Sequence, residues 1–162
     1  MGKHSVVAGI NWKKESFEQK RRELTNWRNH SSFDSTTYPG GLYEINKGAT
    51  NNLALFVQDT YRPNFNWAIY TGLRIDRFKK FDGQHVTYDT TNNRYDTVNH
   101  GEGSYTEWSP RLAIEHYVTD SLNVYASYGH SFNPPPLSQV YRYTDVVRAN
   151  PNLDPERSDT FE

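Results

Sequence analysis

The strongest candidates for ligand contact are three consecutive side chains within FNPPPLSQVYRYTDVVRANPNLDPE (132–156). Tyr141, Arg142 and Tyr143 present two aromatic rings and a guanidinium, which suit aromatic or anionic ligands through stacking and charge. The three prolines ahead of them stiffen the chain where it leaves a strand. We predict that this segment is a loop that contacts a ligand, with a well-packed loop that binds nothing as the alternative.

Two pairs of opposite charges lie in extended runs of the sequence. Arg74 is two residues from Asp76, and Arg111 is four residues from Glu115. Because side chains in a strand alternate between two faces, both members of each pair share the polar face of their strand. We expect both to be ion pairs of a polar wall. The alternative is a solvated sheet face on which these residues have no role.

The sequence contains few residues or motifs that could form a catalytic or metal site. The chain has no cysteine, which excludes a thiolate metal site and a cysteine nucleophile. Its six histidines are scattered without the spacing of two metal ligands: His4, His30, His85, His100, His116 and His130. The sequence has no nucleophile elbow, zinc-protease motif or phosphate loop. We therefore expect no catalytic site, no metal and no cofactor.

A basic run, Lys20-Arg21-Arg22, lies within SFEQKRRELTNWRNH (16–30). The segment begins with a Ser-x-x-Gln box, which favours a short helix. The run suits an anionic ligand or lipopolysaccharide, although such runs more often form a solvated loop face. The net charge of −1 provides no long-range field that would steer nucleic acid, so we expect no nucleic-acid partner.

Strands must position these side chains, and strands are what the hydrophobic pattern predicts. Apolar residues recur with a period of two, in runs rich in β-branched and aromatic residues. Asp59 is an exception on the apolar side of its run, either near a turn where a carboxylate costs little or beside a bulge. The alternating runs cover 5–12, 53–61, 67–78, 109–117 and 122–132, and the last two form a hairpin.

Long and short connections alternate strictly between these runs. The short ones lie around 62–66 and 119–121, and the long ones cover 16–52, 79–104 and 133–157. All the long connections therefore lie at one end of the sheet. Compact soluble domains rarely carry such loops. Long loops on one side, with strands of about ten residues that alternate apolar and polar, are typical of transmembrane β-barrels.

The composition supports the same fold class. The hydrophobic fraction of 35% is below the roughly 45–50% that is usual in soluble domains. An aromatic fraction of 15% nevertheless indicates an ordered chain. The aromatic residues indicate two interfacial girdles. They comprise Tyr61, Phe65, Trp67 and Tyr117 at the short-turn end, and Trp12, Phe78, Phe81, Tyr105, Trp108 and Phe132 at the long-loop end.

Four sequence blocks resemble the TonB-dependent outer-membrane receptors. They are LFVQDTYRP (55–63), TGLRIDRF (71–78), WSPRLAIEHYVTDSLNVYASYGHSFNPP (108–135) and NPNLDPERSDTFE (150–162), in the order of that family. The resemblance covers about half of the chain, and the remainder falls in the loops. It implies an all-β fold of antiparallel up-and-down strands, with about five strands and the start of a sixth from a barrel of about 22 strands.

The resemblance also implies a function. Residues 1–162 would form part of a barrel wall and its outer loops in the bacterial outer membrane, without the plug domain that engages TonB. The receptor would take up a ferric siderophore or a similar scarce nutrient, with lipid around it and no covalent chemistry. Arg74, Asp76, Arg111 and Glu115 would face the lumen. The alternative is a soluble, aromatic-rich β-sandwich that binds carbohydrate.

Overall fold

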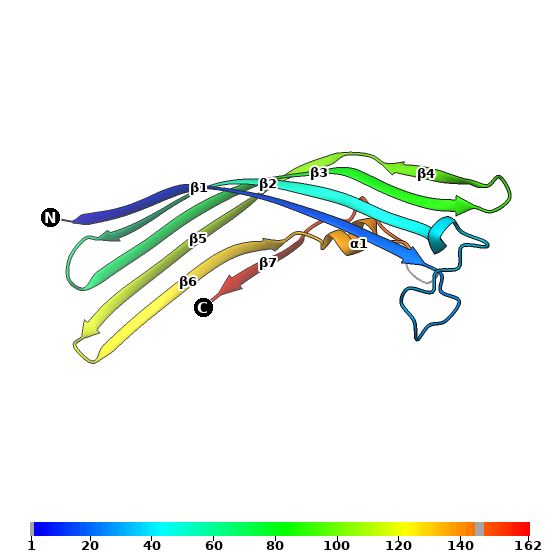
Figure 1. The fold of residues 1–162 in the computed structure, drawn as a ribbon. Coiled ribbons are helices and arrows are strands. Elements are labelled where there is room, and N and C mark those ends of the chain that lie inside the picture. The colour runs from blue at the N-terminus through cyan, green and yellow to red at the C-terminus, as the bar shows by residue number, and fades with distance from the viewer. Residues whose placement is uncertain (1, 145–147) are drawn as a thin grey trace.

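The computed structural model describes residues 2–144 and 148–162, and its strands join in a single curved antiparallel sheet (Figure 1). The strand order is β1-β2-β3-β5-β6-β7, with β4 paired to β3. The elements are β1 (Lys3–Arg22), the 3-10 turn η1 (Pro39–Gly41), β2 (Leu42–Arg62), β3 (Trp67–Asp89), β4 (Arg94–His100), β5 (Gly103–Thr119), β6 (Leu122–Asn133), α1 (Leu137–Tyr141) and β7 (Glu156–Phe161).

Strands β4 and β5 occupy the same side of β3. Residues 67–80 of β3 pair with β5, and residues 83–89 pair with β4. The seven strands therefore fill six positions across the sheet, and β7 is the sixth. This confirms the expected antiparallel strands, five in full and the beginning of another.

Strands extend far into two of the predicted long loops, 16–52 and 79–104, so the predicted extents of these loops are wrong. β1 continues to Arg22, opposite Leu42 of β2, and this excludes the helix expected within 16–30. β3 continues to Asp89 and turns into β4. The hydrophobic pattern missed these extensions because they carry polar side chains on both faces. Ladder hydrogen bonds and ion pairs along one strand face, such as Lys20–Glu18 at 3.0 Å, accompany them instead.

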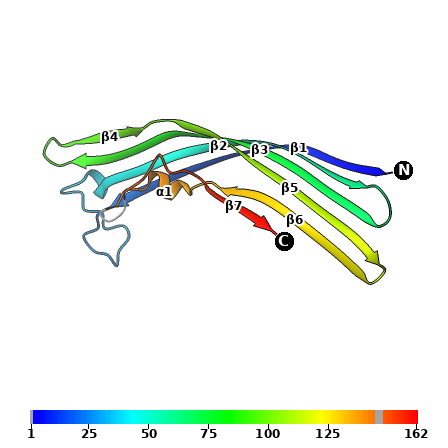
Figure 2. The same ribbon diagram turned by 180° about the vertical axis from the view of Figure 1, so that it is seen from behind.

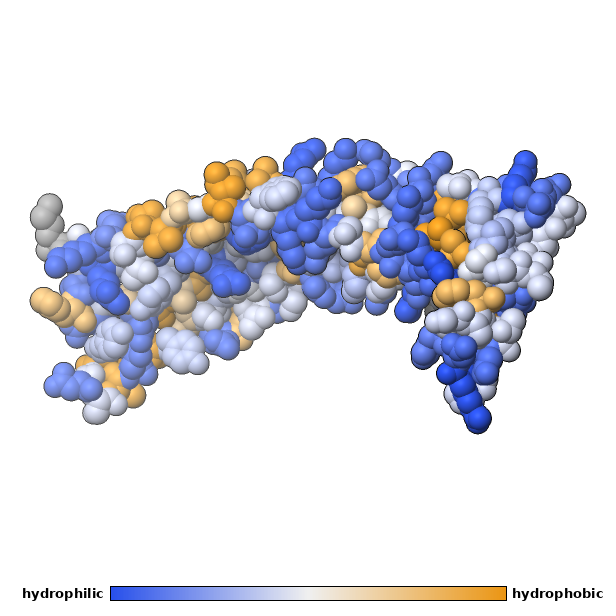
Figure 3. Space-filling view, viewed as in Figure 1, coloured by the Kyte–Doolittle hydropathy of each residue, from blue (hydrophilic) through white to orange (hydrophobic). Residues whose placement is uncertain are grey.

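The predicted difference between the two ends of the sheet is confirmed, although the long connections are shorter than predicted. The turns 63–66 and 120–121 lie at the end of the sheet where the chain begins, and the segments 23–41, 90–93, 134–144 and 148–155 lie toward the other end (Figure 1). We call these the short-turn end and the loop end. The loop 23–41 projects below the sheet at the loop end, where Figure 3 shows a hydrophilic protrusion.

The sheet arches, and α1 lies beneath the arch in both opposite views (Figures 1 and 2). We call the face toward α1 the concave face. Phe78 lines the same hollow as Leu137 and Val140 of α1, so Phe78 is on the concave face. Asp76 precedes it by two residues and points the same way. Residues of the opposite parity therefore lie on the convex face.

Most large apolar side chains of the convex face are exposed. Ile10 is 72% exposed, and Leu55 beside it in the ladder is 51% exposed. In Figure 3 apolar side chains are more widespread over the half of the sheet toward the short turns, and smaller apolar groups lie near the loop end. Few apolar side chains are buried among the described residues: Ala49, Ala54, Ala68, Phe78, Val140 and Tyr141. All seven strands join one sheet, so the alternative of a two-sheet sandwich is wrong.

The expected aromatic girdle at the loop end is partly wrong. Phe78 stacks on Tyr105 at 5.1 Å between ring centroids and meets Phe132 edge-on at 5.6 Å, so these three rings pack together beside α1. Trp12 and Trp108 do have the convex parity and are 63% and 56% exposed. Sequence spacing alone did not separate the two groups because strand twist and loop position decide which rings meet.

An irregularity at the loop end reverses which residues of β3 point inward. Lys47 pairs with Gln84, whereas Ala49 pairs with Phe81, so β3 has one residue more than β2 across this interval. Asp82 has a φ of 55°, a left-handed conformation that is common in bulges. Inward-pointing residues of β3 are even-numbered before the bulge and odd-numbered after it. His85 consequently lies beside Asn46 on the concave face.

Within the described residues, every helix is too short or too polar to span a membrane.

Candidate functional site

The concave face carries an ion pair in the middle of the sheet. Arg74 donates two hydrogen bonds to the carboxylate of Asp76, each 2.7 Å long. Asp76 is 1% exposed and also accepts a 2.9 Å hydrogen bond from the Asn52 side chain. The expected ion pair between Arg74 and Asp76 is present. A buried carboxylate with several donors is held in one orientation, which makes this cluster a rigid part of the wall.

The expected ion pair between Arg111 and Glu115 is wrong. Glu115 accepts hydrogen bonds from the Tyr70 hydroxyl at 3.2 Å and from the Asn123 side chain. Residues four apart in a strand are separated by roughly 13 Å, which is too far for a direct contact. Within residues 2–144 and 148–162, Arg111 has no hydrogen bond or ion pair through its guanidinium.

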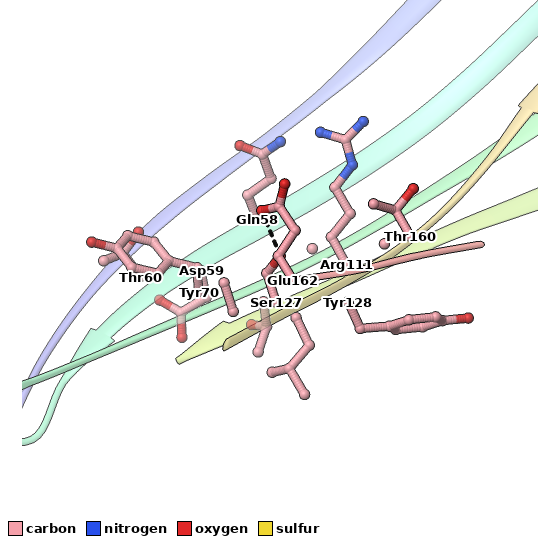
Figure 4. A pocket seen from close by; sticks show the side chains of 14 residues that line it. Gln58, Asp59, Thr60, Tyr70, Arg111, Ser127, Tyr128, Thr160 and Glu162 are labelled. Carbon is pink, nitrogen blue, oxygen red and sulfur yellow. Dashed lines mark hydrogen bonds between the residues drawn. The ribbon is translucent and has the colours of Figure 1, made fainter. Parts of the chain in front are cut away.

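Arg111 lies between two glycines in the ladder, with Gly72 on one side and Gly129 on the other. A hollow of about 390 Å³ opens here (Figure 4). In Figure 4 the side chains of Gln58 and Arg111 extend from one side of the sheet, and Tyr128 extends from the other. The glycines leave the backbone bare beside Arg111, so this part of the wall is open to whatever occupies the concave side.

The unusual Asp59 is explained by a partner on the convex face. Its carboxylate lies 2.6 Å from His4 Nδ1, and the His4 ring stacks on Tyr61 at 4.3 Å. The ladders on both sides of Asp59 are regular, so a bulge is excluded here. Trp67 and His116 make a second stacked pair near this end, at 4.1 Å. Polar groups and aromatic rings thus lie next to one another at the short-turn end, as is typical of a membrane interface.

The loop end holds a hollow of about 500 Å³ that we call the tyrosine hollow. Its walls come from the loop 23–41, from β2 and β3, and from the segment after α1. Rings line most of it, with hydroxyl and charged groups between them. The lining residues are Tyr38, Tyr43, Glu44, His85, Thr87, Tyr88, Tyr143, Thr144 and Arg148. Aromatic faces and a cation together can bind flat, electron-rich or anionic ligands.

A buried network supports the floor of the tyrosine hollow. Glu44 is 6% exposed and binds Arg21 at 2.6 Å, so its charge is compensated. The Asn46 side-chain amide donates to Glu44 at 2.7 Å and to the Tyr143 backbone carbonyl at 3.1 Å. Its carbonyl oxygen lies 2.7 Å from His85 Nδ1. A fully bonded polar floor of this kind fixes the side chains above it.

The three predicted ligand-contact residues occupy different positions. Tyr141 is 1% exposed and packs against the sheet, whereas Arg142 and Tyr143 are half-buried. The Tyr143 ring contacts two imidazoles, His85 at 4.4 Å between ring centroids and His100 at 5.5 Å, and it is nearly parallel to His100. Burial lowers the pKa of His100, and the nearby His85 lowers it further. Of the three, Tyr143 lines the tyrosine hollow, and contact of all three with ligand stays a prediction.

Sequence reasoning missed most of the tyrosine hollow. Tyr38, Tyr43 and Tyr88 lie in segments that were expected to be featureless loops, and His85 was set aside with the other histidines. The abundance of tyrosine, 12 in the chain, was a signal, but it did not show which rings meet. The described residues contain no group of three or more His, Cys, Asp or Glu side chains that could hold a metal ion.

Comparison with known proteins identifies the family. A sequence model described as TonB dependent receptor-like, beta-barrel, matches residues 3–162. The chain belongs to this family of TonB-dependent receptors. These are receptors and transporters of the bacterial outer membrane, and the single arched sheet is a part of their β-barrel.

Two solved structures of one receptor have a similar fold. They are the closed and open forms of the ferric-catecholate import receptor Fiu from E. coli K12. The closed form superposes with a TM-score of 0.70 over 99% of this chain at 19% identity, and the open form with 0.62 over 83% at 20% identity. The chain spans about a quarter of the length of these relatives, 25% and 23%. At this identity the likeness concerns the fold.

Proposed function

We propose that this chain forms part of the barrel wall and outer loops of an outer-membrane receptor that takes up a ferric siderophore or a similar scarce nutrient. The observation that carries the proposal is the tyrosine hollow at the loop end of a receptor barrel sheet. A structurally similar protein is a ferric-catecholate import receptor, which makes a flat aromatic iron chelate the first ligand to test.

The chemistry of the hollow supports such a ligand. The rings of Tyr38, Tyr43 and Tyr143 offer faces and edges on which catechol rings can pack. A ferric complex of three catecholates carries negative charge, which the Arg148 guanidinium would offset. Glu44 is already bonded to Arg21, so it adds little repulsion. The hollow thereby selects for aromatic character and negative charge together.

The wall residues would serve transport rather than capture. The convex face would lie against lipid, and the concave face, with Arg74, Asp76, Arg111 and Glu115, would line the lumen. A plug domain elsewhere in the receptor would close the lumen and engage TonB. Energy from the proton-motive force, transmitted by TonB, would move the plug so that the ligand passes through. The mechanism needs no covalent step.

Uptake of radioactive iron tests this proposal. The full-length receptor that contains this chain would be expressed in bacteria lacking other catecholate receptors, with and without a functional TonB. We expect uptake of ferric catecholate that requires TonB, and no uptake of a ferric hydroxamate. A Tyr143→Ala receptor should bind the ferric catecholate about tenfold more weakly, the effect of losing one buried aromatic contact of about 1.4 kcal/mol. Uptake that persists without TonB would contradict the proposal.

A further inference from the structure

Helix α1 is attached to the concave face by two side chains. Val140 and Tyr141 are each 1% exposed, and α1 packs on β1, β2 and β3 (Figure 2). The segment is only five residues long, so it cannot hold its own conformation without such contacts. The side chain with the larger buried surface is Tyr141, which carries most of the attachment.

The Tyr141 ring occupies a notch between two strand glycines. A Cβ at Gly48 would lie 2.3 Å from the ring, and a Cβ at Gly83 would lie 2.4 Å from it. Neither glycine has a positive φ, so the backbone does not require glycine at either position. Glycine weakens a strand and is often found where another group approaches closely. The two glycines are therefore explained by the space that Tyr141 needs.

The bulge in β3 brings the two glycines together. The shift between Lys47 and Ala49 sets Gly48 across from the extra residue of β3, next to Gly83. The notch and the inward turn of His85 thus have the same structural cause. Two residues beyond Tyr141, the Tyr143 backbone carbonyl accepts a hydrogen bond from the Asn46 side chain, and the Tyr143 ring contacts His85 and His100. Tyr143 and Thr144 line the tyrosine hollow directly after this attachment.

We propose that Tyr141 is a positioning residue: its ring, held between Gly48 and Gly83, fixes Tyr143 in the wall of the tyrosine hollow. Tyr141 acts through Tyr143 and does not itself touch the ligand. The consequence for ligand affinity rests on the proposed function, whereas the attachment itself does not.

Trypsin measures the attachment without any ligand. Arg142 is a cleavage site directly before Tyr143, and trypsin cuts there when Tyr141 and Tyr143 leave the sheet. In the full-length receptor in lipid vesicles, Tyr141→Ala should raise the cleavage rate by about tenfold or more, because it removes a large buried side chain. Tyr141→Phe, which keeps the ring, should leave the rate close to that of the unaltered receptor.

The glycine notch supplies a sharper test in the form of a double-mutant cycle. Gly48→Ala should raise cleavage about as much as Tyr141→Ala does, because the three atoms nearest to the added methyl all belong to the Tyr141 ring. In a receptor that already carries Tyr141→Ala, the same Gly48→Ala change should have almost no effect. Gly72→Ala is the matched control, since a Cβ there meets its nearest neighbour at an ordinary 3.6 Å. Additive effects of Gly48→Ala and Tyr141→Ala on the cleavage rate would contradict the proposal that Gly48 makes room for the Tyr141 ring.

The same variants are then tested for affinity with a ferric tricatecholate complex as the probe. Tyr141→Ala and Gly48→Ala should weaken binding by about tenfold, and Tyr141→Phe and Gly72→Ala should bind as the unaltered receptor does. Faster cleavage with unchanged affinity would overturn the positioning role. If the unaltered receptor binds no ferric tricatecholate, the catecholate ligand of the proposed function is wrong, and the trypsin cycle still decides whether Tyr141 anchors the segment.

Discussion

The two halves of the sheet differ in what covers their side chains. One half lies toward the short turns, and the other lies toward the loops. In the first half the apolar side chains alternate onto the convex face and stay exposed, as Ile10 and Leu55 do. In the second half the strands are mostly polar on both faces, and the buried residues include Glu44, Asn46, Ala49, Val140 and Tyr141, where α1 packs on the sheet. The first half therefore needs an apolar partner outside the protein, whereas the second supplies its own.

The largest effect is expected from a charged substitution on the apolar convex face, in the half of the sheet toward the short turns. Leu55→Arg places a charge in the middle of the apolar convex face, where arginine costs about 2–4 kcal/mol if the neighbour is hydrocarbon. We expect most of the receptor to fail to assemble, measured as the fraction of heat-modifiable barrel on gels. Gln58→Arg, on the concave face of the same strand, is the control. Equal assembly of the two variants would contradict a lipid-facing convex surface.

A smaller effect distinguishes the buried ion pair of the wall from an exposed one. Arg74→Met removes the partner of Asp76, which is 1% exposed, and should lower the free energy of unfolding by about 1–3 kcal/mol. Lys13→Met breaks the Lys13–Glu15 pair, whose side chains are more than half exposed, and should change it by less than about 0.5 kcal/mol. Urea unfolding of the receptor in vesicles measures both. Equal losses would show that Asp76 is solvated.

The smallest expected effect concerns pH at the loop end. Burial lowers the pKa of His100, in β4, below its ordinary value of 6.5. The neutral His100 ring is therefore favoured while Tyr143 is attached to the sheet. Stability from this group is present above pH 6.5 and is lost as the pH falls below it, because only the detached state then gains a proton. His85 and Glu44 also face this cluster.

Hydrogen exchange near Tyr143, corrected for the intrinsic effect of pH, measures this loss. We expect exchange to become faster by a few fold between pH 7 and pH 5.5. A His100→Gln receptor should lose most of this dependence. Exchange that slows as the pH falls would contradict the assigned direction.

The regions that sequence could predict are those with one apolar face. The runs around Leu55 and Leu112 show a clear period of two, and their strands were predicted correctly. The strand from Glu18 to Arg22 was missed because its residues are polar on both faces and only the ladder to β2 holds it extended. The error over Arg111 and Glu115 was avoidable, because strand geometry already separates them.

The candidate site was less predictable than the fold. Tyr143 was chosen for its chemistry, but the other rings of the tyrosine hollow come from segments far apart in sequence. The position of Tyr141 depends on Gly48 and Gly83, which are 35 residues apart and meet only because of the bulge near Asp82. The types and spacing of residues in the sequence do not show that Gly48 and Gly83 lie next to each other in the sheet.

Depth-dependent quenching tests most directly whether the convex face meets lipid. Ile10 and Asn11 are adjacent in β1 and point to opposite faces at the same depth. Each would be replaced by a single cysteine, in a receptor from which any other cysteines have been removed, and labelled with a fluorophore. Lipids with a spin label at the bilayer centre should quench the label strongly in Ile10→Cys and weakly in Asn11→Cys. Equal quenching, or stronger quenching in Asn11→Cys, would contradict the account.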